Sequence, residues 1–569
     1  MKMKKLFNIK LKLKLYAITL IASLMLVTSC NDVLNEQVVD FYNADNFFNT
    51  VGQSNTAITA IYAGLQNNIG SQTFLSSFTT MSDEARGNSW ANVNVFHTFQ
   101  FDSFNSTVAS IYKNLYSGVG NCNFVISGLK KEVMGNQYEA YLAEAKFVRA
   151  YYYLNLVRIF GPVVISKSLP NDPFVTEGPR DSVYKVIDFI LEDLTYASAY
   201  LPKTSIYGHP DKWTAMAMKA RVHLWLASCV DNKVVYYENP PVGGNDYTPA
   251  THYALVKQLC QAVKDSSGYA LYSDYEKLWL TDSKQAESGT GKKEHMFAIN
   301  FNYTGNPNEG NPWTGMCMIW NNLKPAWKVT SDGAKILLGT GYSSLIPQPK
   351  FWLKYEGAST TASTNYKTQA VGSRGDTRRF KGYTIEAIVS DINGPVIVAG
   401  TSAAIFDTSQ SSMFIFSKYA GQGTSGTSTA GDAQIPVMRY ADVLLMLAET
   451  SNWLDDMNTA KVNLNLVRSR AYEGASGAFP RLGYLEVDSK AGLADAIMEE
   501  RCKELVAEVS RWFDLVRTKS IKKLEGYPTI PGTNNYYVVP TLTDKNYFFP
   551  IPANALLSNP KIEQSDLWK

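Results

Sequence analysis

Hydrophobic positions recur at spacings of three and four over residues 139–160, which predicts an α-helix. One row of apolar side chains follows one side of this helix: Leu142, Ala145, Val148, Tyr152, Leu156 and Ile159. A second row, on a different side, consists of Phe147, Ala150, Leu154 and Val157. A surface helix needs one apolar stripe, so a helix with two must be covered on both flanks, as in a solenoid of stacked helices. Gly161 and Pro162 mark its end, since glycine accepts a left-handed turn and proline cannot continue a helix.

The same helical period appears in further segments before and after this one. They are residues 47–65, 108–129, 182–200, 213–227 and 252–270 and, after a long interruption, 437–453, 457–471 and 493–517. Turns rich in Gly, Pro, Asn and Asp join them. These lengths and connections predict stacked helix pairs and therefore a mainly α fold.

The interruption, from 271 to 435, has a different composition. Gly, Ser, Thr, Asn and aromatic residues dominate, and residues 355–379 and 399–433 are nearly low-complexity. So much irregular chain between helical segments is unusual unless it is functional or mobile. We expect a large loop-rich region seated on one side of the helices.

The first 29 residues predict a secretory signal peptide. Six lysines and no acid accompany an apolar core from Leu15 to Val27, which is too short for a convincing transmembrane span. Small residues then precede Cys30, as in the bacterial lipobox, in which the cysteine becomes the acylated first residue of the mature chain. We predict a lipid anchor at Cys30; the alternative is an ordinary cleaved signal with an incidental cysteine. Residues 30–45, polar and without helical period, predict a tether.

Removal of the signal reverses the net charge. The full chain has 54 basic and 51 acidic residues; without six lysines, 48 basic residues face 51 acidic ones, a net charge near −3. No basic tract is left, so we expect neither nucleic acid nor an anionic membrane surface as a partner.

The remaining cysteines and the histidines predict neither disulfides nor a metal site. The five other cysteines are odd in number and contain no Cys-x-x-Cys motif, so buried free thiols are expected: Cys122, Cys229, Cys260, Cys317 and Cys502. The five histidines show no paired ligand spacing. We therefore expect no metal and no cofactor.

Carboxylates and guanidinium groups alternate along residues 499–517, where Glu500, Glu504 and Glu508 follow one another at one-turn spacing. A glycoside hydrolase needs two carboxylates about 5–10 Å apart across a sugar, whereas acids stacked along one helix with arginines between them favour ion pairs between helices. We interpret the run as structural. The same bracing role is expected of Arg149, Arg158, Arg221 and Arg439.

Motifs of serine hydrolases, zinc proteases and phosphate loops are missing, so nothing in the sequence predicts an enzyme.

Two loop segments combine flat aromatic side chains with amides, carboxylates and guanidinium groups: residues 81–94 and residues 302–327. A sugar ring has an apolar C–H face ringed by hydroxyls, so its site needs an aromatic platform with short polar partners. The alternative, that a given tryptophan fills the core of an irregular region, stays equally open for each one. Four tryptophans in helical patterns are expected in the core: Trp213, Trp225, Trp453 and Trp512. Trp279 and Trp352 fit either interpretation.

Five stretches of the chain resemble, in order, the signatures of the SusD/RagB family of nutrient-binding outer-membrane lipoproteins. Residues 143–150 (Ala-Glu-Ala-Lys-Phe-Val-Arg-Ala), continued to 164, resemble the first, and 435–445 (Ile-Pro-Val-Met-Arg-Tyr-Ala-Asp-Val-Leu-Leu) the second. The others are 464–471, 500–515 and 550–564. Departures are modest: Cys502 and Val509 replace more usual residues, and acids after Cys30 are sparse.

The resemblance implies a tetratricopeptide-like superhelix of helix pairs. Residues 46–270 would form N-terminal helical repeats, 271–435 the irregular ligand-binding region, and 436–569 the C-terminal helices and extended tail of the same unit. It also implies an outer-membrane lipoprotein facing the cell exterior, which binds oligosaccharide or polysaccharide and delivers it to a SusC-like TonB-dependent barrel. A RagB-like peptide receptor is the nearest alternative, and a surface glycoside hydrolase is another.

The carbohydrate-binding members of the family build their site from regions that resemble the two loop segments. We accordingly predict a shared site with an aromatic platform drawn from Trp90, Tyr303, Trp313 and Trp320. Its hydrogen-bonding partners are predicted to be Asp83, Arg86, Asn88 and Asn92. The segments lie more than 200 residues apart, so the fold must bring them together.

Overall fold

The computed structural model describes residues 47–87, 94–166, 178–272 except 205 and 207, 294–301, 433–472, 484–526 and 538–569, with short pieces between 275 and 419. The predicted signal peptide, Cys30 and the tether lie outside these residues. Within them, no helix has both the length and the apolar character needed to cross a bilayer.

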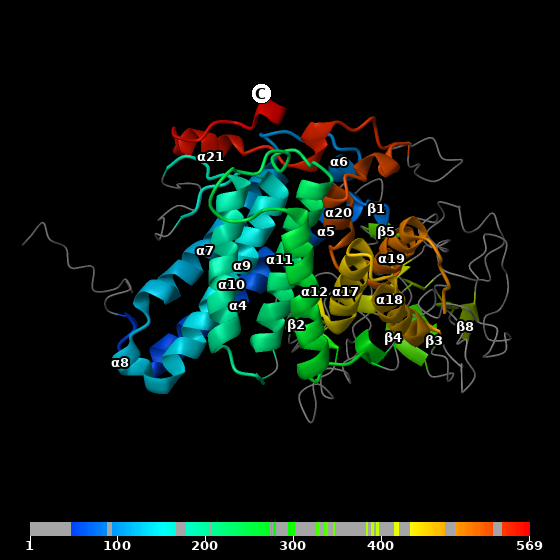
Figure 1. Cartoon of the computed structure of the whole chain (residues 1–569), viewed down its shortest axis with the longest axis horizontal. Helices are drawn as coiled ribbons and strands as arrows, with labels where there is room; N and C mark the ends of the chain where they lie inside the picture. The colour runs from blue at the N-terminus through cyan, green and yellow to red at the C-terminus, as the bar shows by residue number, and fades with distance from the viewer. Residues whose placement is uncertain are drawn as a thin grey trace, which may run out of the picture.

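Long helices packed side by side form the body of the protein (Figure 1). In the first half they are α4 (Val51–Asn68), α5 (Gln72–Thr80), α6 (Asn94–His97), α7 (Ser106–Gly128), α8 (Lys131–Met134), α9 (Tyr138–Phe160), α10 (Val183–Tyr200), α11 (Lys212–Asp231) and α12 (Pro249–Ser266). In the second half they are α17 (Tyr440–Trp453), α18 (Met457–Ala471), α19 (Lys490–Glu504), α20 (Arg511–Arg517) and α21 (Ala553–Ser558). Contacts run from α7 to α9 and then through α10, α11, α12, α17 and α18 in turn. The stacked helix pairs are thus confirmed.

Helix α9 lies inside this stack, between α7 and α10. Both of its predicted apolar rows are buried, and Phe147, Leu154 and Leu156 are fully inaccessible. Gly161 follows the helix with φ +71°, the left-handed conformation that its position predicted.

Local sequence explains where half of these helices begin. Short polar side chains accept a hydrogen bond from the backbone N–H groups of the first turn. Such caps are Thr50, Ser71, Asn105, Ser182, Asp211, Asp456 and Ser489.

Short strands join distant parts of the chain. Strand β10 (Ile435–Arg439) pairs antiparallel with β2 (His295–Ile299), and β1 (Ala85–Gly87) pairs antiparallel with β5 (Leu345–Pro347). A four-stranded sheet has the order β4 (Lys335–Leu338), β3 (Ala326–Val329), β7 (Ile388–Asp391), β8 (Gly394–Ile397), and β6 (Tyr383–Thr384) pairs with β9 (Ile415–Phe416). Strand β8 lies on the side of α18 and α19 away from α9 (Figure 1).

Two predicted helix boundaries are wrong. The helix expected from 437 begins at Tyr440, because residues 435–439 are extended and paired with β2. The helix expected over 493–517 is broken into α19 and α20, and Ala507 and Val509 between them have φ +59°. A left-handed valine is rare, and the break has an external cause: Nζ of Lys418 donates to the carbonyl oxygens of Glu504 (3.1 Å) and Val506 (2.8 Å).

Candidate ligand-binding site and the charged core beneath it

Strand β1 belongs to the first of the two predicted binding segments, and its pairing shows where that segment lies. Ala85 pairs with Pro347, Arg86 with Ile346 and Gly87 with Leu345. The partner strand comes from the irregular region, more than 250 residues further along the chain. The fold therefore brings the first segment to the region that also contains the second.

The second segment starts close to the same part of the framework. Strand β2 leads into Asn300 and the buried Phe301, directly before residue 302. Nε2 of Gln66, in α4, donates to the carbonyl oxygen of Asn300, and a Cβ added at Gly70 would lie 3.2 Å from the Phe301 ring. Helix α5, about 14 Å long at 1.5 Å per residue, is the only element between this corner and Met81, where the first segment begins.

The carboxylate of Asp83 is buried and bonded to the framework. Nε and Nη2 of Arg511, at the start of α20, donate to its two oxygens over 2.7 and 3.0 Å. Asp83 is 5 % exposed. A buried carboxylate that already receives a two-pronged guanidinium has little capacity for a sugar hydroxyl, so we now expect Asp83 to position the segment and not to contact ligand.

Arg86 is equally buried but differs in its contacts. The hydrogen bond of its guanidinium within the described residues runs from Nη1 to the carbonyl oxygen of Gly87 at 3.3 Å, and its Nε has no partner. Burial lowers the pKa of Arg86 to about 10, so it stays charged at neutral pH. A buried guanidinium with an unpartnered Nε is a group that a ligand oxygen would stabilise.

Glu84, between these two residues, was not singled out from the sequence. It is 1 % exposed, and burial, together with the neighbouring Asp83, raises the pKa of its carboxyl to about 8. The side chain is therefore largely protonated at pH 7. No sequence pattern indicates this, because the shift depends on the packing around the strand.

Six predicted site residues lie outside the described residues: Asn88, Trp90, Asn92, Tyr303, Trp313 and Trp320. Their roles stay predictions, as does the stacking platform as a whole. Trp352 and Cys317 lie outside as well.

The tryptophans expected in the core divide into two pairs. Trp225 and Trp512 are buried, as predicted. Trp213 and Trp453 are partly exposed, which corrects the prediction; the Trp453 ring stacks on Tyr253 at 4.4 Å and its Nε1 donates to Asp231 at 3.0 Å. Trp279 is buried beneath Lys418, whose Nζ lies 4.4 Å from its ring centre.

The acids of residues 499–517 form ion pairs between elements, which confirms their structural interpretation. Arg439 binds three carboxylates, those of Glu294, Glu504 and Glu508. Arg470 pairs with Glu294 and Glu504, and Lys418 pairs with Glu508. Three cations thus face three carboxylates, all buried. Glu500 pairs separately with Arg468 at 3.2 Å.

A second buried cluster joins α11, α17, α19 and α20. Asp442 accepts from Arg221 (2.6 Å) and Arg501 (2.7 Å), and these guanidinium groups hold the pKa of its carboxyl well below the usual range, against its burial. Asp514 accepts from Arg501 (2.9 Å) and from Arg517, which also pairs with Glu449. The expected bracing role of Arg221 and Arg439 is confirmed, and Arg149 braces α9 to α10 through Asp193 (2.8 Å). Arg158 pairs with no carboxylate of the described residues.

The four described cysteines Cys122, Cys229, Cys260 and Cys502 are buried free thiols, as predicted. Burial raises the pKa of the Cys122, Cys229 and Cys260 thiols. They are therefore packing residues and not nucleophiles. The described residues contain no group of three or more His, Cys, Asp or Glu side chains placed to hold a metal ion.

Comparison with known proteins identifies relatives along the whole chain. A model of the SusD family matches residues 275–568, and a model described as starch-binding associating with outer membrane matches residues 40–224. SusD-like protein P2 of Formosa agariphila is 25% identical over 566 residues, which cover 96% of this chain and 98% of the relative.

Solved structures show the same fold. A SusD homolog from Bacteroides thetaiotaomicron superposes with a TM-score of 0.68 at 21% identity, covering 92% of this chain and 98% of its own. A laminarin-binding SusD-like protein superposes with a TM-score of 0.64 at 20% identity, and the match covers 91% of this chain and 99% of the other. Surface glycan-binding protein A from Bacteroides uniformis superposes with a TM-score of 0.64 at 18% identity, and the match covers 91% of this chain and 100% of the other.

Proposed function

The chain belongs to the SusD family, and on that premise we propose that it is a cell-surface lipoprotein of the outer membrane that binds oligosaccharide or polysaccharide. In this proposal Cys30 carries the lipid anchor, and the bound glycan passes to a SusC-like TonB-dependent barrel. The observation that carries the binding role is the pairing of β1 with β5, which places the first aromatic and polar segment beside the irregular region.

The chemistry of the two segments supports a glycan as ligand. They provide flat rings for the C–H face of a sugar and amide or guanidinium groups for its hydroxyls. Arg86 adds a buried guanidinium with an unpartnered Nε within the first segment. Two structural relatives carry names that state laminarin or glycan binding.

The distribution of acids supports binding without turnover. Hydrolysis of a glycosidic bond requires one carboxyl that gives up a proton and a second that acts as nucleophile or base. Glu294, Glu500, Glu504 and Glu508 are instead each held by a guanidinium or ammonium group. Each of these carboxylates is thus committed to an ion pair inside the framework and does not face a second carboxyl across an open site.

The test uses the mature protein with Cys30→Ser, so that it is soluble without detergent. Calorimetry against neutral glucans, other plant and host glycans, and a matched peptide set measures binding, and an assay of released reducing ends measures turnover. We expect binding to at least one glycan class, without new reducing ends. Binding to peptides alone contradicts the glycan proposal and favours the receptor alternative. Turnover that disappears on changing Glu500 or Glu504 overturns the non-enzymatic role.

A further inference from the structure

A partly enclosed cavity lies inside the helical framework, where α5, α9, α11, β10, α17 and the break between α19 and α20 meet. Apolar side chains of α5 and strand residues close one side of it. The other side is lined by charged groups that include Arg158, Arg221, Arg501 and Asp442. The site described above does not use this cavity.

Arg158 is the member of this lining without a charged partner. It is 7 % exposed, and its hydrogen bond within the described residues is from Nη2 to Oδ1 of Asn155 at 2.8 Å. Its Nε has no partner, and its guanidinium lies over the Phe513 ring, 3.9 Å from the ring centre. Burial lowers the pKa of Arg158 to about 9, so it stays protonated at neutral pH.

The charges around Arg158 do not balance. Arg221, Arg501 and Arg517 share three carboxylates, those of Asp442, Asp514 and Glu449. The neighbouring cluster around Arg439 is balanced by three carboxylates of its own. Among the described residues, Arg158 thus adds one positive charge beyond those that the carboxylates of this region pair with, and an unpaired buried charge is costly.

We propose that the cavity is a binding site for a small monovalent anion, such as chloride, held against the guanidinium of Arg158. Tyr151 lies two helical turns before Arg158 on the same face of α9 and also lines the cavity. In this proposal its hydroxyl donates a second hydrogen bond to the anion. The anion restores the charge balance and accepts from the unpartnered Nε of Arg158.

Two measurements test the site directly. Crystals of the mature protein soaked in sodium bromide should show an anomalous bromine peak in the cavity, within hydrogen-bonding distance of Arg158. In solution, raising sodium chloride from 1 to 100 mM should increase the melting temperature by about 2–3 °C more than sodium gluconate at equal ionic strength. Gluconate is a much larger anion than chloride and serves as the control for screening of surface charges.

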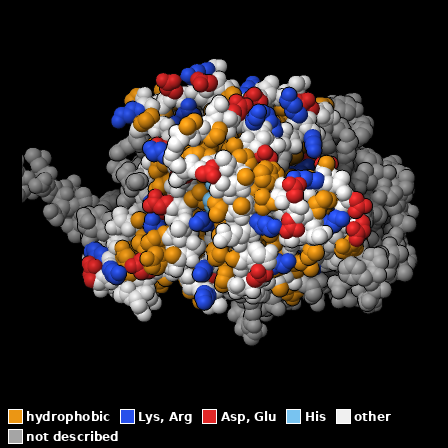
Figure 2. All heavy atoms as spheres, viewed as in Figure 1, with side chains coloured by type: hydrophobic (Ala, Val, Ile, Leu, Met, Phe, Trp, Pro, Cys, Tyr) orange, Lys and Arg blue, Asp and Glu red, His pale blue; other side chains and the backbone are white. Residues whose placement is uncertain are grey.

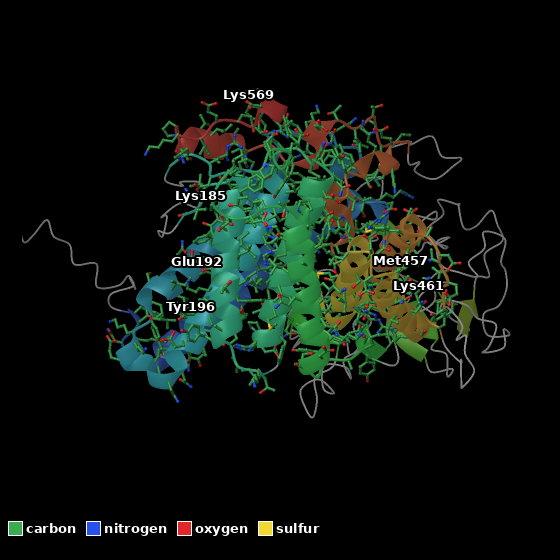
Figure 3. The ribbon with its side chains drawn as sticks, in the orientation of Figure 1. Lys185, Glu192, Tyr196, Met457, Lys461 and Lys569 are labelled. Atoms are coloured by element: carbon green, nitrogen blue, oxygen red, sulfur yellow. The ribbon has the colours of Figure 1, made fainter. Side chains whose placement is uncertain are left out.

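Variants separate the site from general salt effects. Tyr151→Phe removes a donor but no charge, so it should fold and bind the anion about fivefold more weakly. Arg158→Met should abolish both the bromide peak and the chloride effect. The matched control is Lys185→Met, because Lys185 lies on the outer side of α10 with its side chain 69% exposed (Figure 3); it should respond to chloride like the wild type. Absence of the bromide peak from the wild-type cavity, or equal melting in the two salts, overturns the proposal, even when Arg158→Met fails to fold.

Discussion

Asp83 and Arg511 stand 428 residues apart in the chain and form a buried, two-pronged ion pair. Asp83 lies just before strand β1, and Arg511 is the first residue of α20. A guanidinium that meets a carboxylate through two parallel hydrogen bonds fixes direction as well as distance. The pair therefore fastens the first binding segment to the C-terminal helices.

We expect Asp83→Asn to lower the free energy of unfolding by about 3–5 kcal/mol, because it leaves the Arg511 guanidinium buried without its carboxylate. Urea denaturation of the mature protein measures this loss. Asp83→Asn combined with Arg511→Met should lose less than the sum of the single variants, since the double variant leaves no charge unpaired. If Asp83→Asn keeps the stability of the wild type but loses affinity for glycan, Asp83 contacts the ligand and the structural role is wrong.

Arg86 leads to the opposite expectation. Arg86→Met removes a buried guanidinium that pairs with no carboxylate of the described residues, so stability should be unchanged or slightly higher. If Arg86 donates to the glycan, affinity should fall by about 10- to 100-fold, the effect of losing a charged hydrogen bond of about 1.5–3 kcal/mol. Calorimetry and thermal unfolding are measured side by side, with Lys185→Met as the control. Unchanged affinity would exclude Arg86 from the site.

A buried histidine pair makes stability depend on pH. Nδ1 of His223 and Nδ1 of His252 lie 2.8 Å apart, and Nε2 of His252 donates to the carbonyl oxygen of Asp246 at 2.9 Å. The pair is held neutral, because burial lowers the pKa of His252 and lowers that of His223 to about 3. In the unfolded chain both rings are protonated below about pH 6.5. The stability from this pair is therefore full above that pH and is lost as the pH falls towards 3.

We expect the free energy of unfolding to fall by about 2 kcal/mol between pH 6.5 and pH 5 for His223 alone, at about 1.4 kcal/mol per pH unit. Glu84 acts in the opposite direction in this window, because its carboxyl is protonated in the folded protein up to about pH 8 and ionised in the unfolded chain above about pH 4. The contribution of His223 is therefore read from the difference in slope between the wild type and a variant. His223→Gln keeps a polar side chain without titration, and its pH slope should be correspondingly smaller. Equal slopes for the two proteins in urea titrations would contradict this assignment.

Local signals made most of the helical framework predictable. The apolar period of α9 and cap residues such as Ser182 and Asp211 act within a few residues of the structure that they determine. The break between α19 and α20 could not be read in this way. Apolar residues continue the helical pattern through it, and the ammonium of Lys418 that binds the free carbonyl groups comes from nearly 90 residues away.

The site was less predictable for a related reason. Asp83 and Arg86 look alike in the sequence, as charged residues of one polar loop segment. They differ because Asp83 meets Arg511 from the far end of the chain, whereas Arg86 meets no carboxylate among the described residues. Which charged groups are already paired is a property of tertiary structure. By contrast, the near balance of basic and acidic residues could be read from the composition. Basic and acidic side chains are interspersed on the face shown in Figure 2.

Lipid anchoring gives a prediction at the start of the chain. The basic start, the short apolar core and the small residues before Cys30 lead us to expect cleavage after residue 29 and acylation of Cys30. Several acyl chains hold a protein firmly on a membrane, whereas one holds it only marginally. Cys30→Ser should therefore leave the membrane fraction of fractionated cells. A Cys30→Ser protein that stays there with its signal removed would contradict the anchor.

The aromatic platform gives the last prediction, which concerns Trp90 and Trp320. If these rings stack on the glycan, Trp90→Ala and Trp320→Ala should each cost on the order of 2 kcal/mol of binding free energy, roughly thirtyfold in affinity, with little change in melting temperature. If they instead fill the core, the same changes should cost about 3–5 kcal/mol of stability. Trp512→Ala is the matched control, because this ring is 1 % exposed and should show the core pattern. Calorimetry and thermal unfolding of the three variants separate the two roles, and a large fall in melting temperature, or unchanged affinity, in both Trp90→Ala and Trp320→Ala would exclude the platform.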